Sequence, residues 1–154
     1  MHKITTSSYK KAMSKYATGI TIVSINDKNN YIGKTVNSFS SLSLNPPLVL
    51  FSLDKKSSSL KKFLNSKFIG INILSNKQKK ISYHFSKKKP IWGKTKVFLS
   101  SKNIPLIENA VVNLSCENFK NIESGDHIIF ICKVINVMKN NKLKPLSYYN
   151  SKYY

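Results

Sequence analysis

Apolar residues along this chain recur mostly at alternate positions or in short unbroken runs, and both patterns are typical of β-strands. β-Branched and apolar side chains fill residues 18–25, and a second strand is expected over residues 31–36, after the turn-forming stretch "NDKNN". The run "LVLFSL" at residues 48–53 follows a double proline and is nearly continuous in apolar residues. It predicts a strand that is buried on both faces.

The second half of the chain carries three more strand patterns. Residues 67–74 alternate, with Ile69, Ile71 and Ile73 on one face. The stretches "AVVNLSCENF" at residues 110–119 and "HIIFICKVINVM" at residues 127–138 also predict strands. The last of these is long enough to bend across a barrel.

Three short stretches have helical spacing instead: residues 7–17, a segment that begins near residues 57–59, and residues 75–85. In the first, Ala12, Met13 and Tyr16 lie three and four positions apart behind the candidate caps Thr6 and Ser7, which predicts an amphipathic helix. In the second, Leu60, Phe63 and Leu64 share one face. The third opens with Ser75 and Gln78, the spacing of a capping box.

The order of these elements indicates the fold class. Short helices lie between strands that mostly follow one another as hairpins, which favours a closed antiparallel barrel with helical decoration. Residues 87–103 show little periodicity and are expected to form a loop or lid. No repeat or linker divides the chain, so we expect one mainly β domain over residues 1–154.

The net charge of +20 is the most unusual property of the composition and would suggest a nucleic acid or an anionic membrane as partner. However, every one of the 26 basic residues is Lys, whereas Arg is favoured for bidentate contacts to phosphate and guanine. The lysines are also scattered, and most aromatic residues lie in apolar, strand-like contexts. A nucleic-acid-binding domain therefore stays a remote alternative, and no specific nucleic acid is expected as a partner.

The two cysteines point to a reducing compartment. Cys116 and Cys132 each lie within an apolar stretch and lack the spacing of a zinc site, so buried free thiols are expected and no metal. The basic start of the chain lacks an apolar stretch of signal-peptide length, and no apolar run has the length of a membrane span. We therefore expect a cytoplasmic protein.

Hydroxyl and amide side chains gather on both sides of the predicted strand at residues 48–53. Ser57–Ser59 open a helix beside two lysines, which could form a phosphate cradle or merely a helix cap. Before the strand, Asn37, Ser38, Ser40 and Ser43 could bond their own backbone or present polar groups to a heterocycle. The glycine-rich fingerprints of dinucleotide and P-loop sites are absent from this stretch.

Several stretches together resemble the flavin reductase family, the small reductase components of two-component flavin monooxygenases. They are "YATGITIVSI", "GKTVNSFSSLSLNPPLVLFSLDKKSSSLKKF", "FIGINILS", "GDHIIFICKVINV" and the tail "PLSYYNSKY". The resemblance covers residues 12–153. It implies a split β-barrel that binds FMN or FAD, forms a homodimer and uses NADH or NADPH to reduce the flavin.

The resemblance also implies which residues form the site. Residues expected to contact the flavin are Lys34, Thr35, Val36, Asn37, Ser38, Ser52, Leu53, Asp54, Ser57, Ser58, Ser59 and Phe85, with the three serines near the phosphate. His127 and Tyr153 are expected to contact the nicotinamide nucleotide, and no side chain is expected to act as an acid or base. From the residues alone, His127 could equally be a strand-end histidine bonded to Asp126.

Two features depart from the family's pattern. Lys34 replaces a small or apolar residue after Gly33, and "KKKPIWGKTKVF" matches the family's central loop poorly. The leading hypothesis is an NAD(P)H:flavin oxidoreductase that supplies reduced flavin to a partner monooxygenase. The alternative is a flavin-binding redox module without turnover. The choices between FMN and FAD, and between NADH and NADPH, stay open.

Overall fold

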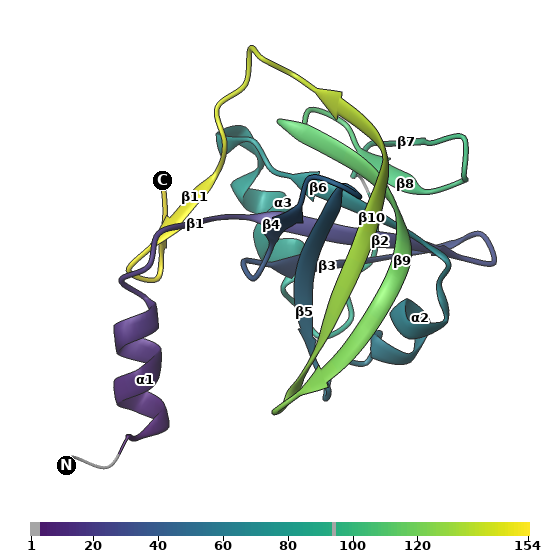
Figure 1. Ribbon diagram of the computed structural model, residues 1–154. Helices are drawn as coiled ribbons and strands as arrows, with labels where there is room; N and C mark the ends of the chain where they lie inside the picture. Colours follow the sequence, from purple (N-terminus) through teal and green to yellow (C-terminus); the bar gives the residue numbers. More distant parts are fainter. Residues whose placement is uncertain (1–3, 94) are drawn as a thin grey trace.

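The structure, a computed structural model, describes residues 4–93 and 95–154 and consists mainly of strands (Figure 1). In chain order its elements are α1 (Thr6–Met13), β1 (Thr18–Gly19), β2 (Thr21–Asp27), β3 (Asn30–Val36), β4 (Ser40–Ser43), β5 (Leu48–Asp54), α2 (Leu60–Asn65), β6 (Phe68–Ile73), the 3-10 turn η1 (Asn76–Gln78), α3 (Lys79–Phe85), β7 (Val97–Leu99), β8 (Pro105–Ile107), β9 (Val112–Ser124), β10 (His127–Lys139), β11 (Ser147–Tyr149) and β12 (Lys152–Tyr153).

A seven-stranded antiparallel sheet forms the body of the molecule, in the order β3-β2-β6-β9-β10-β5-β4. In Figure 1 the sheet curves so that β3 and β5 lie near each other. Helix α3 packs beside β2 and β3, and α2 packs against β5 and β10. The two end strands of the sheet, β3 and β4, are not paired with each other. The prediction of a mainly β, antiparallel split barrel with short flanking helices is confirmed.

Stacked aromatic rings fill the interior of the barrel. Phe51 of β5 and Phe130 of β10 stack with ring centroids 4.9 Å apart, and Phe63 of α2 meets both rings edge-on. All three side chains are fully buried. Burial of a large aromatic side chain contributes about 2 kcal/mol or more, so this trio ties α2 to the two strands that border the candidate site.

A buried amide in β6 joins four strands through hydrogen bonds. Asn72 Nδ2 donates to the carbonyl of Ile22 at 2.9 Å and to Ser24 Oγ at 3.1 Å. Its Oδ1 accepts from the Ile107 N–H and from Asn113 Nδ2, each at 2.8 Å. Since a buried polar group without a partner costs free energy, this network fixes β8 against β2, β6 and β9.

The first predicted helix is wrong in its extent. Helix α1 ends at Met13 and is capped by Thr5, whose Oγ1 accepts the Ser8 N–H at 3.1 Å, so Tyr16 lies beyond the helix. Within the described chain the helix buries none of its residues, and it stands away from the barrel in Figure 1. The apolar face predicted for this helix is therefore not buried by the rest of the described chain.

The third predicted helix is a 3-10 turn, η1, followed by α3, and Gln78 Oε1 accepts the Ser75 N–H at 3.0 Å as the capping-box pattern predicts. Among the described residues, no helix combines the length and apolar character needed to cross a bilayer.

Several strand predictions need correction. Residues 18–25 form two strands, because β1 pairs with β11 whereas β2 belongs to the main sheet. The strand at residues 48–53 is buried on one face only, since Leu48, Leu50 and Ser52 stay partly exposed. An alternating burial pattern replaces the two-sided burial that its apolar run indicated.

Apart from β1, which lies in a predicted strand, the shortest strands were not predicted, and β8 is one of them. Strand β4 lies in the serine-rich stretch, β7 lies within the segment expected to be a loop or lid, and β11 and β12 form the tail. Each has four residues or fewer, which is too short for alternation to show in the sequence.

Replacement of Asn72 by Leu should destabilise the fold. The substitution keeps the side chain's size but leaves the Ile107 N–H and the Asn113 amide without their shared acceptor. We expect a loss of about 3 kcal/mol in the free energy of unfolding, measured by urea denaturation. Asn121→Ala, on the exposed part of β9, is the control and should change the value by less than about 0.5 kcal/mol. Equal effects of the two variants would contradict the role given to the network.

Candidate functional site

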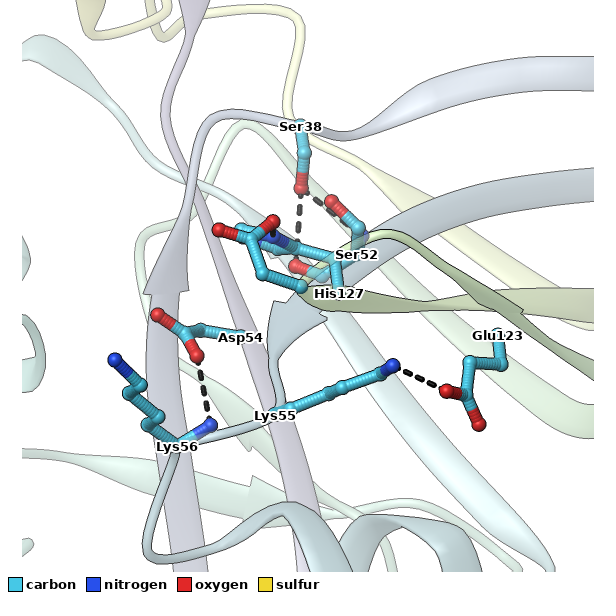
Figure 2. Close-up of polar contacts among 8 residues, drawn as sticks. Ser38, Ser52, Asp54, Lys55, Lys56, Glu123 and His127 are labelled. Carbon is cyan, nitrogen blue, oxygen red and sulfur yellow. Dashed lines mark hydrogen bonds and ion pairs between the residues drawn. The ribbon is translucent and has the colours of Figure 1, made fainter. Parts of the chain in front are cut away.

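A cleft of about 370 Å³ opens where β3, β5 and β10 come together (Figure 2). It is lined by Lys34, Thr35, Val36, Asn37, Ser38, Ser52, Leu53, Asp54, Lys56, Ser57 and His127. Antiparallel pairing of β5 with β10 sets His127 opposite Asp54 and Ile129 opposite Ser52. Three segments far apart in the sequence therefore supply one wall each.

Ser38 fastens the loop after β3 to strand β5. Its Oγ accepts the Ser52 N–H at 3.0 Å and donates to the Ser52 carbonyl at 3.2 Å, as Figure 2 shows. Both backbone groups of Ser52 are thus occupied by one side chain. This hydroxyl fixes the spacing between the two walls of the cleft. Of the two roles that the sequence left open for Ser38, the structure shows hydrogen bonding to the backbone, and the backbone belongs to strand β5.

The turn after β5 is held by its own backbone and by one carboxylate. Asp54 Oδ1 accepts the Lys56 N–H at 2.7 Å, and the Ser57 N–H donates to the Asp54 carbonyl at 2.9 Å. The side chain of Lys55 points the other way and forms an ion pair with Glu123 of β9 (Figure 2). As a result Lys56, and not Lys55, lines the cleft.

His127 stands at the mouth of the cleft beside an acidic partner. Its Nδ1 lies 2.7 Å from Asp126 Oδ1, and 42% of the His127 side chain is exposed. The hydrogen bond from His127 lowers the pKa of Asp126 from its usual value, with the charge of His127 adding to the effect. The carboxylate therefore orients the imidazole ring while leaving its other edge open.

A second cavity, of about 530 Å³, lies beyond Lys34, which borders both. It is lined by Asn30, Tyr31, Ile32, Gly33, Lys34, Ser58, Ser59, Lys62, Lys88, Lys89, Pro90, Ile91 and Trp92. Sequence reasoning missed most of these residues, because they come from β3, α2 and the segment after α3 and share no motif. For the lysines of this cavity, the only signal in the sequence was its generally high lysine content.

Lys34 pins the segment that follows α3. Its Nζ donates to the Lys87 carbonyl at 2.8 Å and to the Lys88 carbonyl at 3.3 Å, and Ser58 Oγ donates to the same Lys88 carbonyl at 3.0 Å. Partial burial lowers the pKa of Lys34. The residue that departs from the family's pattern thus acts as a strut between β3 and the poorly matching segment.

The three serines at the start of α2 divide between the cavities. Ser57 lines the cleft, whereas Ser58 and Ser59 line the second cavity. The hydroxyls of Ser57 and Ser59 lie 3.1 Å apart and bond to each other. All three hydroxyls are therefore already engaged within the chain.

Phe85 and Tyr153 lie outside the lining of the cleft. Phe85 is fully buried behind β3, where a Cβ added at Gly33 would come within 2.8 Å of its ring. Tyr153 Oη lies 2.9 Å from Ser82 Oγ, and the Ser82 carbonyl accepts from Thr35 Oγ1 at 2.7 Å. Phe85 supports the strand from behind, and Tyr153 reaches it only through α3.

The chain belongs to the family described as flavin reductase like domain, which it matches over residues 13–154. It is 33% identical over 128 residues to an NADH-dependent flavin reductase of Rhodococcus sp., covering 81% of this chain and 72% of that one. It is 32% identical over 152 residues to the reductase component of the flavin-dependent trigonelline monooxygenase of Acinetobacter baylyi, covering 94% of this chain and 47% of that longer protein.

A solved structure shares the fold closely. The NADH:FAD oxidoreductase SgcE6 of Streptomyces globisporus, in complex with NAD and FAD fragments, superposes with a TM-score of 0.92 at 26% identity, over 96% of this chain and 90% of that one. The resemblance found in the sequence is confirmed. The expectation of one domain over residues 1–154 stays a prediction.

Removal of the Lys34 hydrogen bonds should increase the mobility of the segment after α3. Lys34→Met keeps the length of the side chain but cannot donate to the carbonyls of Lys87 and Lys88. We expect hydrogen exchange of the Ser86 and Lys87 amides, which donate to the Ser82 and His84 carbonyls, to become roughly tenfold faster, equivalent to about 1.4 kcal/mol of lost protection. Lys61→Met, on the exposed face of α2, is the matched control. Unchanged exchange in Lys34→Met would show that the segment is held by other contacts.

Proposed function

We propose that this protein is an NAD(P)H-dependent flavin oxidoreductase whose flavin ring lies in the cleft between β3 and β5. The observation that carries the proposal is the convergence of the residues that family resemblance assigns to the ring, residues 34–38 and 52–54, on one cleft with His127 at its mouth. Family membership supports the reaction class. The Rhodococcus relative and the Streptomyces structure, named for NADH-dependent flavin chemistry, support the pairing of flavin with a nicotinamide nucleotide.

The cleft suits a flavin in both shape and chemistry. An isoalloxazine ring presents carbonyl and N–H edges to its surroundings, and the cleft offers the Asn37 amide, the Ser52 hydroxyl and the ends of two strands. Beyond Lys34 the second cavity adds Lys88 and Lys89, whose charges suit a phosphate, whereas the ammonium of Lys62 is paired with Asp27 at 3.0 Å. The two cavities together have room for a phosphorylated flavin.

The protein's contribution to the reaction is alignment. Bound flavin and nicotinamide supply hydride transfer from the nicotinamide C4 to the flavin N5. Asn37 and Ser52 would hold the ring edge, while Ser38 keeps the two walls at a fixed distance. His127, oriented by Asp126, would contact the nicotinamide nucleotide at the open side of the cleft. Correct placement of two reactants removes much of the entropic barrier without any acid or base from the protein.

The decisive assay follows absorbance at 340 nm while the protein is mixed anaerobically with NADH or NADPH and with FMN or FAD. Loss of the 340 nm band together with bleaching of the flavin is the expected result, and it identifies both preferred nucleotides. Bound flavin without nucleotide oxidation would replace the proposal with a flavin-binding redox module that lacks turnover.

Replacement of His127 by Ala should weaken use of the nicotinamide nucleotide. We expect kcat/KM for NADH or NADPH to fall roughly tenfold, about 1.4 kcal/mol of transition-state stabilisation, while the flavin Kd changes much less. His127→Gln, which keeps a hydrogen-bonding group, should recover part of the loss. An equal loss of flavin affinity in His127→Ala would instead assign the residue to the flavin.

We further propose that two copies of the chain form a homodimer through α1. Tyr9, Met13 and Tyr16 expose 57%, 52% and 75% of their surface, and the helix carrying two of them stands clear of the barrel. Exposed apolar residues gathered on one element are typical of an interface between protein chains. A second copy of the chain would bury this face.

The double variant Tyr9→Glu and Met13→Glu should therefore be monomeric in light scattering coupled to size exclusion, while the unmodified protein elutes as a dimer. Ser7→Glu with Lys11→Gln changes the charge of α1 by the same amount on the opposite face and should leave the dimer intact. A dimer that survives in both variants would place the interface elsewhere.

Two finer points complete the proposal. Reduced flavin would pass to a partner monooxygenase, as the name of the Acinetobacter relative suggests for that protein. A cytoplasmic location is proposed from Cys116 and Cys132, which are free and buried. Burial raises the pKa of both thiols, that of Cys132 to about 12, so they stay protonated and unreactive.

A further inference from the structure

A third cavity, of about 770 Å³, lies between α3 and the segment that follows it. Its lining comprises Ser75, Lys77, Gln78, Lys80, Ile81, His84, Ile91, Trp92, Gly93, Thr95, Lys96, Glu108, Asn109 and Leu143. It shares Ile91 and Trp92 with the second cavity and has no lining residue in common with the cleft. The third cavity is therefore distinct from the cleft in which the flavin ring is proposed to lie.

The surface of this cavity is mainly apolar. Ile81 of α3 lies on one side, Ile91 and Trp92 on another, and Leu143 of the turn after β10 contributes as well. Apolar concave surfaces of this size with a few polar groups are typical of small-molecule sites. The apolar side chains favour a ring or short hydrocarbon body in the ligand.

The charged residues that line the cavity favour a negatively charged ligand. Lys77, Lys80 and Lys96 line the cavity, against the single carboxylate of Glu108. Gln78 Nε2 already donates to the Glu108 backbone carbonyl at 2.7 Å, so this side chain is engaged. All three lysines are exposed, and their excess of ammonium groups at the cavity favours an anion.

The wall also holds a polar group without a partner. Trp92 Nε1 is buried and has no hydrogen-bond acceptor among the described residues, while the ring packs against Phe85 and Tyr31 with centroids 4.7 and 5.9 Å away. A buried indole N–H usually has an acceptor, and one left unpaired destabilises the fold. Because the surrounding side chains cover this atom, an acceptor on a ligand would reach it only after the indole ring turns.

We propose that this cavity binds a small amphipathic anion, with an aromatic or aliphatic body against Ile81, Trp92 and Leu143 and an anionic group near Lys80 and Lys96. The site is independent of the proposed reductase reaction. Its ligand would contact Ile91 and Trp92, which follow the two residues whose carbonyls Lys34 and Ser58 hold.

The test uses 8-anilinonaphthalene-1-sulfonate, a fluorescent amphipathic anion, titrated into the protein of residues 1–154. The double variant Lys80→Glu and Lys96→Glu reverses the charge of the proposed site. Lys56→Glu with Lys88→Glu makes the same change in charge at the cleft and the second cavity. Far-UV circular dichroism checks that both variants fold. Displacement by 1-naphthoate is compared with displacement by the neutral 1-naphthylmethanol.

The proposal expects saturable binding to the unmodified protein, at least tenfold weaker binding to Lys80→Glu/Lys96→Glu, and a change of less than threefold in Lys56→Glu/Lys88→Glu. Naphthoate should displace the probe better than the alcohol does. The proposal is overturned if no saturable emission appears, if both variants lose affinity equally, or if the cleft variant loses more. Because the readout requires no flavin or nucleotide, its failure is distinguishable from a failure of the reductase assay.

Discussion

The antiparallel pairing of β5 with β10 is the constraint on which the proposed site depends. Its register places His127 opposite Asp54, at the point where both strands end and the cleft opens. A slip by one residue would turn every side chain of β10 to the other face of the sheet and remove His127 from the cleft. The stacked rings of Phe51 and Phe130 lie in this same pair of strands and resist such a slip, because both are fully buried.

Polar contacts then convert this sheet edge into a cleft of fixed width. Ser38 holds the loop after β3 to Ser52, and Lys34 holds the segment after α3 over β3. A partly buried lysine here is unusual for the family's pattern, yet its ammonium finds two carbonyl acceptors and so is compensated. Preorganised walls of this kind suit a reaction in which alignment of two reactants supplies most of the catalysis.

Much of the barrel could be predicted from the sequence, because β2, β3, β6, β9 and β10 carry alternating or β-branched runs long enough to show their period. Apart from β1, the strands of four residues or fewer could not be predicted, because they are determined by their pairing partners and not by a pattern of their own. The resemblance to the family likewise indicated residues 34–38, 52–54 and 57–59. The second cavity escaped prediction because Tyr31, Lys62 and Lys88 meet only through tertiary packing. For the same reason the sequence placed Phe85 at the site, although it packs behind β3.

The central claim is that a flavin ring lies between residues 34–38 and 52–54, with His127 at its open side. A crystal structure of the protein with FMN or FAD bound tests this most directly. The account predicts electron density for the isoalloxazine ring in the cleft, within hydrogen-bonding distance of the walls formed by β3 and β5. A ring bound elsewhere on the barrel, or in the cavity beside α3, would contradict it.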